Sequence, residues 1–246
     1  LSEIPSQIPG IDTIETQIID DGSTDNTLEV ARSLGINHII QLGQNKGLAF
    51  AFKAGIDNAI KQGADYLLNT DGDNQYKGEY IPILVKRAVV ENADLVIGCR
   101  PIINHPEFSL IKKILQSIGS WVLRKLSKTD IKDAASGFRI YSRNALLHLN
   151  IYSDFSYCME TLIQLGNSNM KIIGIEIGIN PKTRESRLFN NILTYLWRQT
   201  KTIINIFLVY KANVFFGVIS TFIFLISLIM AIRFLVLIYF FNISAG

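Results

Sequence analysis

The sequence predicts an α/β domain with a mostly parallel β-sheet, and three observations support this fold class. Short apolar runs alternate with helical stripes over residues 14–99, as in chains whose strands are joined by helices. The apolar runs at 66–70 and 95–99 are almost continuous, which is expected of strands that are covered on both faces. Charged residues follow directly after several of the runs.

The first half of the predicted domain contains two strands and two helices. A strand at 14–20 ends in an acidic pair, and Ser23 or Thr24 is expected to cap the following helix. A short strand is predicted at 38–42. The next helix, at 48–63, has apolar residues at helical spacing and ends at a glycine.

The second half continues the alternation. The run at 66–70 predicts a buried strand, and apolar residues three and four positions apart predict a helix over 81–89. The run at 95–99 predicts another buried strand. A further helix is expected at 108–126, where core packing and contact with a membrane surface both explain the apolar residues.

Polar groups follow three of the predicted strands. In open α/β sheets, ligands bind outside the carboxyl ends of the strands. Because these three groups fall at that edge, we expect them to form one site: Asp20-Asp21, Asp71-Gly72-Asp73 and Gly98-Cys99-Arg100.

The Asp71 and Asp73 carboxylates predict a divalent metal site. Two carboxylates one residue apart at a strand end can share a hard cation, which keeps other positions for water and diphosphate oxygens. A solvated turn is the simpler interpretation of the same residues. The chain has neither a Gly-x-Gly-x-x-Gly nor a Gly-Lys sequence, so metal and basic side chains are expected to hold phosphate.

Composition excludes some classes of function. The net charge of the 246 residues is only +3, which gives no support to nucleic-acid binding. Cys99 and Cys158 provide no disulfide framework and fit a reducing compartment. Nothing in the sequence indicates an oligomeric state.

The C-terminal part predicts membrane attachment. Between Val214 and Phe241 the one charge is Arg233, and the run exceeds the roughly 20 apolar residues that cross a bilayer. A buried core helix is the alternative. The segment 188–208 has an apolar face typical of a helix in the headgroup plane. An excess of basic residues between Pro181 and Lys211 predicts the cytoplasmic side.

A series of motifs covers nearly the whole chain, at 19–27, 45–47, 71–75, 93–100, 133–143 and 182–187. In this order the motifs resemble those of the family 2 nucleotide-sugar glycosyltransferases, and in particular the branch with dolichol-phosphate mannose synthase and other polyprenyl-phosphate glycosyltransferases.

The resemblance implies a GT-A-like, Rossmann-like domain and a set of site residues. Asp71 and Asp73 would bind Mg²⁺ or Mn²⁺. The implied donor-binding residues are Asp20, Asp21, Gly22, Lys46, Gly47, Asp71 and Gln75. For Asp20, Asp21 and Gly22, a plain turn and helix cap is the alternative interpretation.

The acceptor determines which further residues are needed. A lipid phosphate is already largely ionised at neutral pH, so it needs positioning more than activation, and arginine suits that task. The candidates for acceptor phosphate are Arg100, Ser136, Arg139, Arg184 and Arg187. The candidate catalytic residues are Asp133, Glu160 and Arg139, the two carboxylates either orienting these groups or acting as base. Surface ion pairs or lipid headgroups could instead explain the arginines.

The sequence therefore predicts a membrane-anchored, inverting glycosyltransferase. It would move one sugar from a GDP-mannose-type or UDP-glucose-type donor to a polyprenyl or dolichyl phosphate at the cytoplasmic face of the cell membrane, or of the endoplasmic reticulum in a eukaryote. Transfer to a lipid or glycan hydroxyl and a non-catalytic, nucleotide-sugar-binding tether are the alternatives.

The predicted boundaries are 1–187 for the catalytic domain, 188–211 for the amphipathic juxtamembrane segment, 212–242 for the transmembrane helix and 243–246 for the start of a loop. The family's usual first strand, with its Pro-x-x-Asn-Glu-like turn, is missing from 1–187, so we expect a fragment. A Gln-x-x-Arg-Trp motif is also missing, which disfavours a polymerising enzyme.

Overall fold

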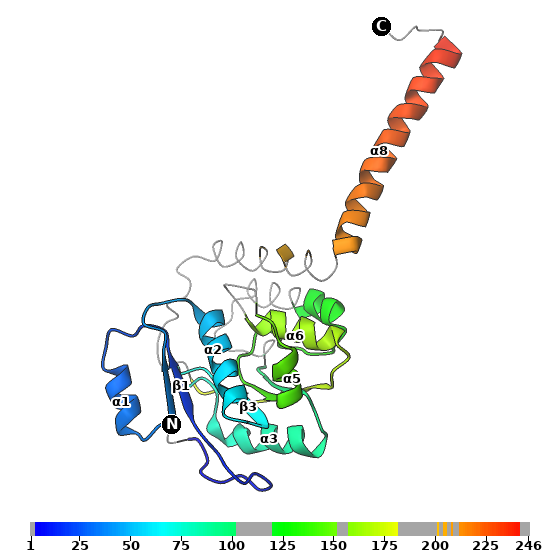
Figure 1. The fold of residues 1–246 in the computed structure, drawn as a ribbon. Coiled ribbons are helices and arrows are strands. Elements are labelled where there is room, and N and C mark those ends of the chain that lie inside the picture. Colours follow the sequence, from blue (N-terminus) through cyan, green and yellow to red (C-terminus); the bar gives the residue numbers. More distant parts are fainter. Residues whose placement is uncertain are drawn as a thin grey trace. The chain divides into compact units, whose positions relative to one another are not determined.

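The computed structural model describes residues 3–101, 120–151, 157–181, 201, 204–205, 208 and 212–241. Its contacts divide the chain into two compact units, Leu1–Leu188 and Phe189–Gly246 (Figure 1). The predicted Arg184 and Arg187 loop, most of the juxtamembrane segment and residues 102–119 lie outside the described residues.

The first unit begins with two parallel strands, β1 (Gln17–Asp20) and β2 (His38–Gln41). Helix α1 (Thr27–Ser33) connects them. The predicted cap is wrong: Asn26, not Ser23 or Thr24, occupies the N-cap position of α1. The Ser23 backbone N–H instead donates to the Asp20 carboxylate at 3.1 Å, so the turn after β1 extends past Ser23.

The main sheet has four strands in the order β3 (Tyr66–Asn69), β5 (Arg139–Ser142), β4 (Leu95–Cys99) and β6 (Ile172–Glu176). Strand β5 runs antiparallel to β3 and β4, whereas β4 and β6 are parallel. The α/β class is confirmed, and β3, β4 and β6 share one direction. Strands β5 and β6 were not predicted from the sequence.

Helices cover both sheets. Helix α2 (Leu48–Lys61) packs on β1, and α3 (Ile81–Val90), which follows the 3₁₀ turn Gly78–Tyr80, packs on β4 and β5. Helices α5 (Arg143–His148) and α6 (Tyr157–Asn167) pack on each other and on α2. The buried core includes Leu84, Val85, Ala88, Val96, Phe138 and Ile140.

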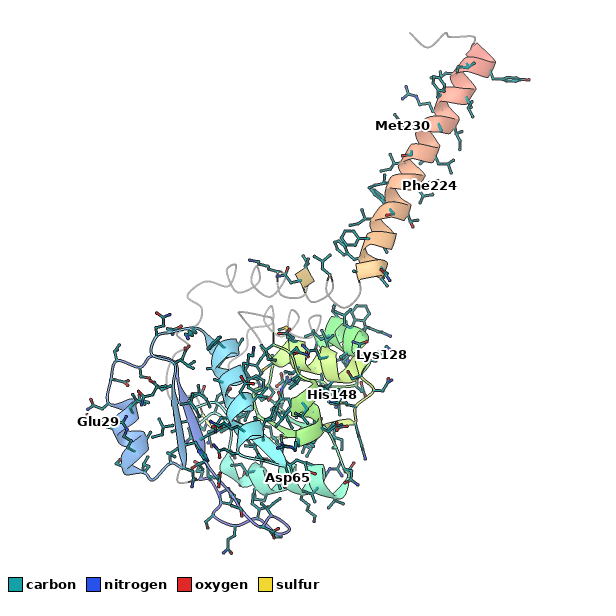
Figure 2. The ribbon with its side chains drawn as sticks, viewed as in Figure 1. Glu29, Asp65, Lys128, His148, Phe224 and Met230 are labelled. Atoms are coloured by element: carbon teal, nitrogen blue, oxygen red, sulfur yellow. The ribbon has the colours of Figure 1, made fainter. Side chains whose placement is uncertain are left out.

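The second unit contains α8 (Ala212–Phe241). The predicted helix is confirmed, and Ala212–Tyr239 is long and apolar enough to cross a membrane. Large apolar side chains along α8, such as Phe222, Phe224 and Leu235, are exposed (Figure 2). Their exposure is expected of a helix that meets lipid.

Candidate active site

The strand order brings together the ends that carry polar residues. Asn69, the last residue of β3, pairs with Arg139, the first residue of β5, and Arg139 also pairs with Ile97 of β4. Because β5 is antiparallel, its beginning lies at the same edge as the ends of β3 and β4. The segments 70–76 and 133–138 and Arg100 therefore meet at one edge of the sheet.

The Asp71 carboxylate lies against the backbone of Gly137. A Cβ at Gly137 would lie 2.9 Å from both carboxylate oxygens of Asp71 and 3.1 Å from the Tyr157 hydroxyl. Burial raises the pKa of Asp71, and the Asp73 charge raises it further, while Arg100 and Arg139 lower it. Among the described residues, the structure gives the Asp71 carboxylate no hydrogen bond.

Side chains hold the Gly137 peptide from both sides. The Gly137 N–H donates to the Tyr76 hydroxyl at 3.0 Å, and the Asn69 amide donates to the Gly137 carbonyl at 2.8 Å and to the Tyr157 hydroxyl at 2.9 Å. Burial raises the pKa of Tyr76 to about 12, so its hydroxyl is neutral at physiological pH. The ring of Tyr76 stacks on Phe138. Gly137 is thus fixed where it meets Asp71.

The rest of the acidic loop is held by its own turn and by a distant segment. The exposed Asp73 carboxylate accepts the Gln75 N–H at 3.0 Å. Asn74, between them, has a left-handed φ of 56°. Asn180 donates its backbone N–H to the Gln75 carbonyl at 2.9 Å and its side-chain amide to the Asn74 carbonyl at 3.0 Å. These bonds fix the path of the chain next to Asp73.

Arg100 and Asp133 form a buried, bidentate ion pair. The Arg100 Nε and Nη2 donate to the two Asp133 oxygens at 2.7 and 3.1 Å. Burial alone would lower the pKa of Arg100, but the Asp133 carboxylate raises it above its ordinary value. Arg100 Nη1 also contacts the Gln75 side-chain oxygen at 3.5 Å. Asp133 therefore orients an arginine that reaches the acidic loop.

These contacts separate the two roles considered for Asp133. Its side chain is fully buried and also accepts the backbone N–H groups of Arg100 and Ala135. A general base needs a free lone pair within reach of the acceptor proton. The position of Asp133 favours the orienting role and does not suit the base.

The acceptor-phosphate role predicted for Arg139 and Ser136 does not fit their positions. Both side chains are fully buried. Arg139 donates to the carbonyls of Ser136, Cys158 and Ala134 and to the Thr161 hydroxyl. The Ser136 hydroxyl donates to the Gly98 carbonyl at 2.6 Å. Both side chains instead hold the loop before β5 against its neighbours.

Glu160 lies on α6 with 3% of its surface exposed. Its carboxylate accepts the Gln164 amide at 3.4 Å. So little exposure leaves a substrate almost no access to Glu160, which argues against its use as a base.

The residues predicted to bind the donor include a preformed contact. The two Asp21 oxygens accept the backbone N–H groups of Lys46 and Gly47 at 2.7 and 2.8 Å. Gly22 has φ +83°, and a Cβ there would lie 2.9 Å from the Asn45 nitrogen. This close approach requires glycine. The predicted proximity of Asp21 to Lys46 and Gly47 is therefore present in the structure.

Asp20 and the Lys46 ammonium have different surroundings. Asp20 is buried at the end of β1, where its carboxylate accepts the Ser23 backbone N–H. The Lys46 ammonium lies 4.7 Å from the centre of the Phe50 ring, and both side chains are exposed. Lys46 can therefore swing toward an anionic ligand without breaking an ion pair to any residue that the structure describes.

The residues present fit a divalent cation. Asp71 offers a partly buried carboxylate without a hydrogen-bond partner among the described residues, and its raised pKa reports an unfavourable negative charge. A nearby cation relieves that cost. In the described part of the chain no group of three or more His, Cys, Asp or Glu residues could hold a metal. Two carboxylates would thus leave most coordination positions to water or ligand oxygens.

Sequence reasoning missed several residues that build this edge. Asn69, Tyr76 and Gly137 belong to or adjoin the quoted motifs, and an asparagine at a strand end was a usable signal. Tyr157 and Asn180 come from distant segments. No spacing pattern points to them, because their role depends on the tertiary fold.

Comparison with known families identifies the chain. Residues 6–149 match the family described as Glycosyl transferase family 2. The chain belongs to this family. Family membership makes it a glycosyltransferase and confirms the predicted resemblance.

Two curated proteins illustrate what the chain is similar to. The UDP-N-acetylglucosamine–dolichyl-phosphate N-acetylglucosaminyltransferase of Methanococcus voltae is 28% identical over 177 residues, or 63% of this chain and 70% of the relative. The undecaprenyl-phosphate mannosyltransferase of Micrococcus luteus is 26% identical over 160 residues, or 61% of this chain and 63% of the relative. Both names specify a polyprenyl phosphate.

Solved structures of glucosyl-3-phosphoglycerate synthase from Mycobacterium tuberculosis share the fold. The complex with Mn²⁺, UDP and glucosyl-3-phosphoglycerate has a TM-score of 0.61 and 18% identity, and the match covers 85% of this chain and 72% of that chain. Another complex of the same enzyme contains Mg²⁺ and UDP. The likeness confirms the predicted GT-A-like fold.

Proposed function

We propose that this glycosyltransferase is metal-dependent and inverting, and that it transfers a single sugar from a nucleotide-sugar to a polyprenyl phosphate at the cytoplasmic face of a membrane. The donor is of the UDP-glucose or GDP-mannose type. The observation that carries this proposal is the Asp71 carboxylate, which lies partly buried beside Asp73 with a raised pKa.

The acidic loop suits a diphosphate leaving group. Asp71 and Asp73 would hold Mg²⁺ or Mn²⁺, which would supply positive charge to the departing nucleoside diphosphate. Gly137 and Tyr76 fix the orientation of the Asp71 side chain through contacts within the sheet edge. In this proposal Asp21, which holds the backbone of Lys46 and Gly47, takes part in binding the nucleoside.

Arg100 is the best candidate to position the acceptor. Its side chain is 15% exposed and held by Asp133, so its guanidinium stays charged and oriented. An arginine fork of this kind pairs well with phosphate oxygens. Arg184 and Arg187 remain proposals for the same role. A phosphate nucleophile needs no general base, which agrees with the burial of Asp133 and Glu160.

Relatives support the acceptor class. The names of the Methanococcus and Micrococcus enzymes specify dolichyl and undecaprenyl phosphate. Attack by a phosphate oxygen in a single displacement inverts the anomeric centre. Glucosyl-3-phosphoglycerate synthase has been solved with phosphoglyceric acid, and this observation keeps a hydroxyl acceptor as the second candidate.

Membrane attachment completes the proposal. In this proposal the catalytic domain is the predicted 1–187 and the membrane span is the predicted 212–242, while most of the predicted segment 188–211 and all of 243–246 lie outside the described residues. The length and apolar surface of α8 support the span, and the basic residues near 181–211 support the cytoplasmic orientation.

The test is a transfer assay with the full chain in uncharged detergent. Labelled UDP-sugars and GDP-sugars are incubated with polyprenyl phosphate or with the unphosphorylated polyprenol, with and without chelator. We expect a lipid-linked product that requires both the phosphate and the metal. Product on polyprenol would favour the hydroxyl alternative, and activity that survives chelation would refute the metal role.

Two matched variants sharpen the test. Asp71→Asn should reduce transfer by at least about a hundredfold, the scale of losing one strong electrostatic contribution to a transition state. Asp57→Asn, which removes an exposed carboxylate from α2, should leave transfer unchanged. Equal rates for the two variants would contradict the proposed metal site.

A further inference from the structure

Residues 120–127 are helical and are anchored on the end of α6. The buried side chains of this helical segment are Leu123, Leu126 and Ser127. The Asn167 amide donates to the Leu126 carbonyl at 3.0 Å. A Cβ at Gly166 would lie 2.0 Å from the Ser127 carbonyl oxygen, so only glycine permits this packing. One face of this helical segment is therefore held against α6, and the opposite face is turned away from the core.

The outer face borders a basic hollow. The hollow has a volume of about 500 Å³ and is lined by Trp121, Arg124, Lys125, Lys128, Thr129 and Asp130. Trp121 is 55% exposed. Lys128, labelled in Figure 2, is exposed as well. Within the described part of the chain, Arg124, Lys125 and Lys128 form no ion pair. The hollow contains one carboxylate, that of Asp130.

Helix stability alone does not explain this surface. Cations in the last turn of a helix favourably meet its dipole, which accounts for Arg124 and Lys125. Lys128, however, has a left-handed φ of 55°, a conformation that glycine adopts with less strain. The exposed Trp121 ring also gains nothing from the dipole. An exposed indole beside three cations that pair with no described residue therefore points to a ligand.

We propose that this hollow binds the headgroup of an anionic bilayer phospholipid. Lysine and arginine side chains attract phosphate and anionic membrane surfaces, and tryptophan favours the boundary between headgroups and acyl chains. The same chain carries α8, which is apolar enough to enter a bilayer. Headgroup binding at this hollow is independent of the transfer reaction, so it can be tested separately from the proposed function.

The hollow is separate from the acidic loop. Helix α6 begins at Tyr157, whose hydroxyl meets Asn69, and ends at Asn167, which meets the helix at 120–127. Ten residues of helix span about 15 Å. The lipid headgroup would therefore hold the catalytic unit at a point one helix length from Asp71.

The test measures headgroup binding through Trp121. In a Trp197→Phe background, Trp121 is the sole tryptophan of the chain. The full chain in uncharged detergent is titrated with short-chain phosphatidylglycerol, short-chain phosphatidylcholine or glycerol phosphate. We expect a saturable change in Trp121 emission with phosphatidylglycerol, and binding at least about tenfold weaker with the other two.

Two triple variants of equal charge change provide the comparison. Arg124→Gln with Lys125→Gln and Lys128→Asn should weaken phosphatidylglycerol binding about a hundredfold, since each basic residue near an anionic surface contributes roughly fivefold. Lys53→Gln with Lys61→Gln and Lys86→Gln, which alters exposed lysines of α2 and α3, should bind as before. Equal affinity of the two variants, or equal binding of glycerol phosphate or phosphatidylcholine, would overturn the proposal.

Discussion

Gly137 packs directly on the carboxylate of Asp71, with space for a hydrogen but not for a methyl group between them. Gly137 lies just before β5, and Asp71 lies just after β3. The pairing of these two strands therefore sets the position of the acidic loop. Any change that moves the start of β5 should also move the carboxylate that we propose as a metal ligand.

Alanine substitutions at two glycines test this relationship. Gly137→Ala should weaken Mn²⁺ binding and transfer roughly a hundredfold, because a shift of about 1 Å in a reacting group has effects of that size. Gly72→Ala should be tolerated, since nothing lies within 4 Å of a Cβ there. Metal-induced thermal shifts and initial rates measure both effects. If Gly137→Ala bound Mn²⁺ normally, the backbone contact would not position Asp71.

The raised pKa of Asp71 predicts how metal affinity depends on pH. Protons and metal compete for the carboxylate, so Mn²⁺ affinity should fall as pH falls through the folded-state pKa, which lies above the ordinary 3.8. Titrations of the Mn²⁺ dissociation constant from about pH 7.5 down to the lowest pH at which the chain stays folded check this. Asp57→Asn should retain the profile of the unmodified chain, and an affinity that begins to fall only at the pH of an ordinary aspartate would argue against a raised pKa.

The same shift predicts the sign of a stability effect without metal. The folded state binds the Asp71 proton more tightly than the unfolded state does. The unfavourable charge is therefore present above the folded-state pKa and is relieved as pH falls through it. Asp71→Asn should raise the melting temperature near neutral pH, where the charge is present. The difference in melting temperature between the variant and the unmodified chain should shrink at acidic pH. A lower melting temperature at neutral pH would contradict the burial argument.

The Arg100 and Asp133 pair predicts a stability cost. Asp133→Asn leaves a buried guanidinium without its counter-charge, a loss of roughly 3 to 5 kcal/mol. For a domain of this size that is a fall of about 6–20 °C in melting temperature, which circular dichroism in detergent would measure. If Asp133 acted as a base instead, its loss would remove one limb of the pH–rate profile and leave the melting temperature nearly unchanged.

Arg139 should behave as a structural residue. Arg139→Lys removes several of its bonds to the carbonyls of Ser136, Cys158 and Ala134, and we expect a lower melting temperature from these unsatisfied acceptors. Arg87→Lys, an exposed change on α3, is the control. A selective rise in the KM for polyprenyl phosphate with unchanged stability would restore the acceptor role first predicted for Arg139.

The sequence predicted the parts of the fold that depend on local pattern. Strands β3 and β4 were recognisable because they are continuous apolar runs, and α2 and α3 because their apolar residues recur at helical spacing. Strand β5 was not recognised. Its first residue, Arg139, is charged, and its insertion between β3 and β4 depends on pairing across about 70 residues.

The candidate site shows the same division. The Asp71 and Asp73 carboxylates lie in one short motif. The contact of Asp21 with Lys46 joins two quoted motifs, at 19–27 and 45–47. The burial of Arg139 could not be predicted from a motif, because its four acceptors come from residues 134–136 and from the distant helix α6. An arginine in a motif has the same sequence signal whether it meets a ligand or a carbonyl.

The position of β5 also determines when during synthesis the acidic loop acquires its final shape. Asn69 gains its pairing partner Arg139 only after residues 139–142 have left the ribosome. A nascent chain arrested before that point carries both aspartates but lacks the Gly137 peptide that packs on one of them. The loop can therefore take its final shape only after β5 has been synthesised, yet before the apolar residues of α8 emerge.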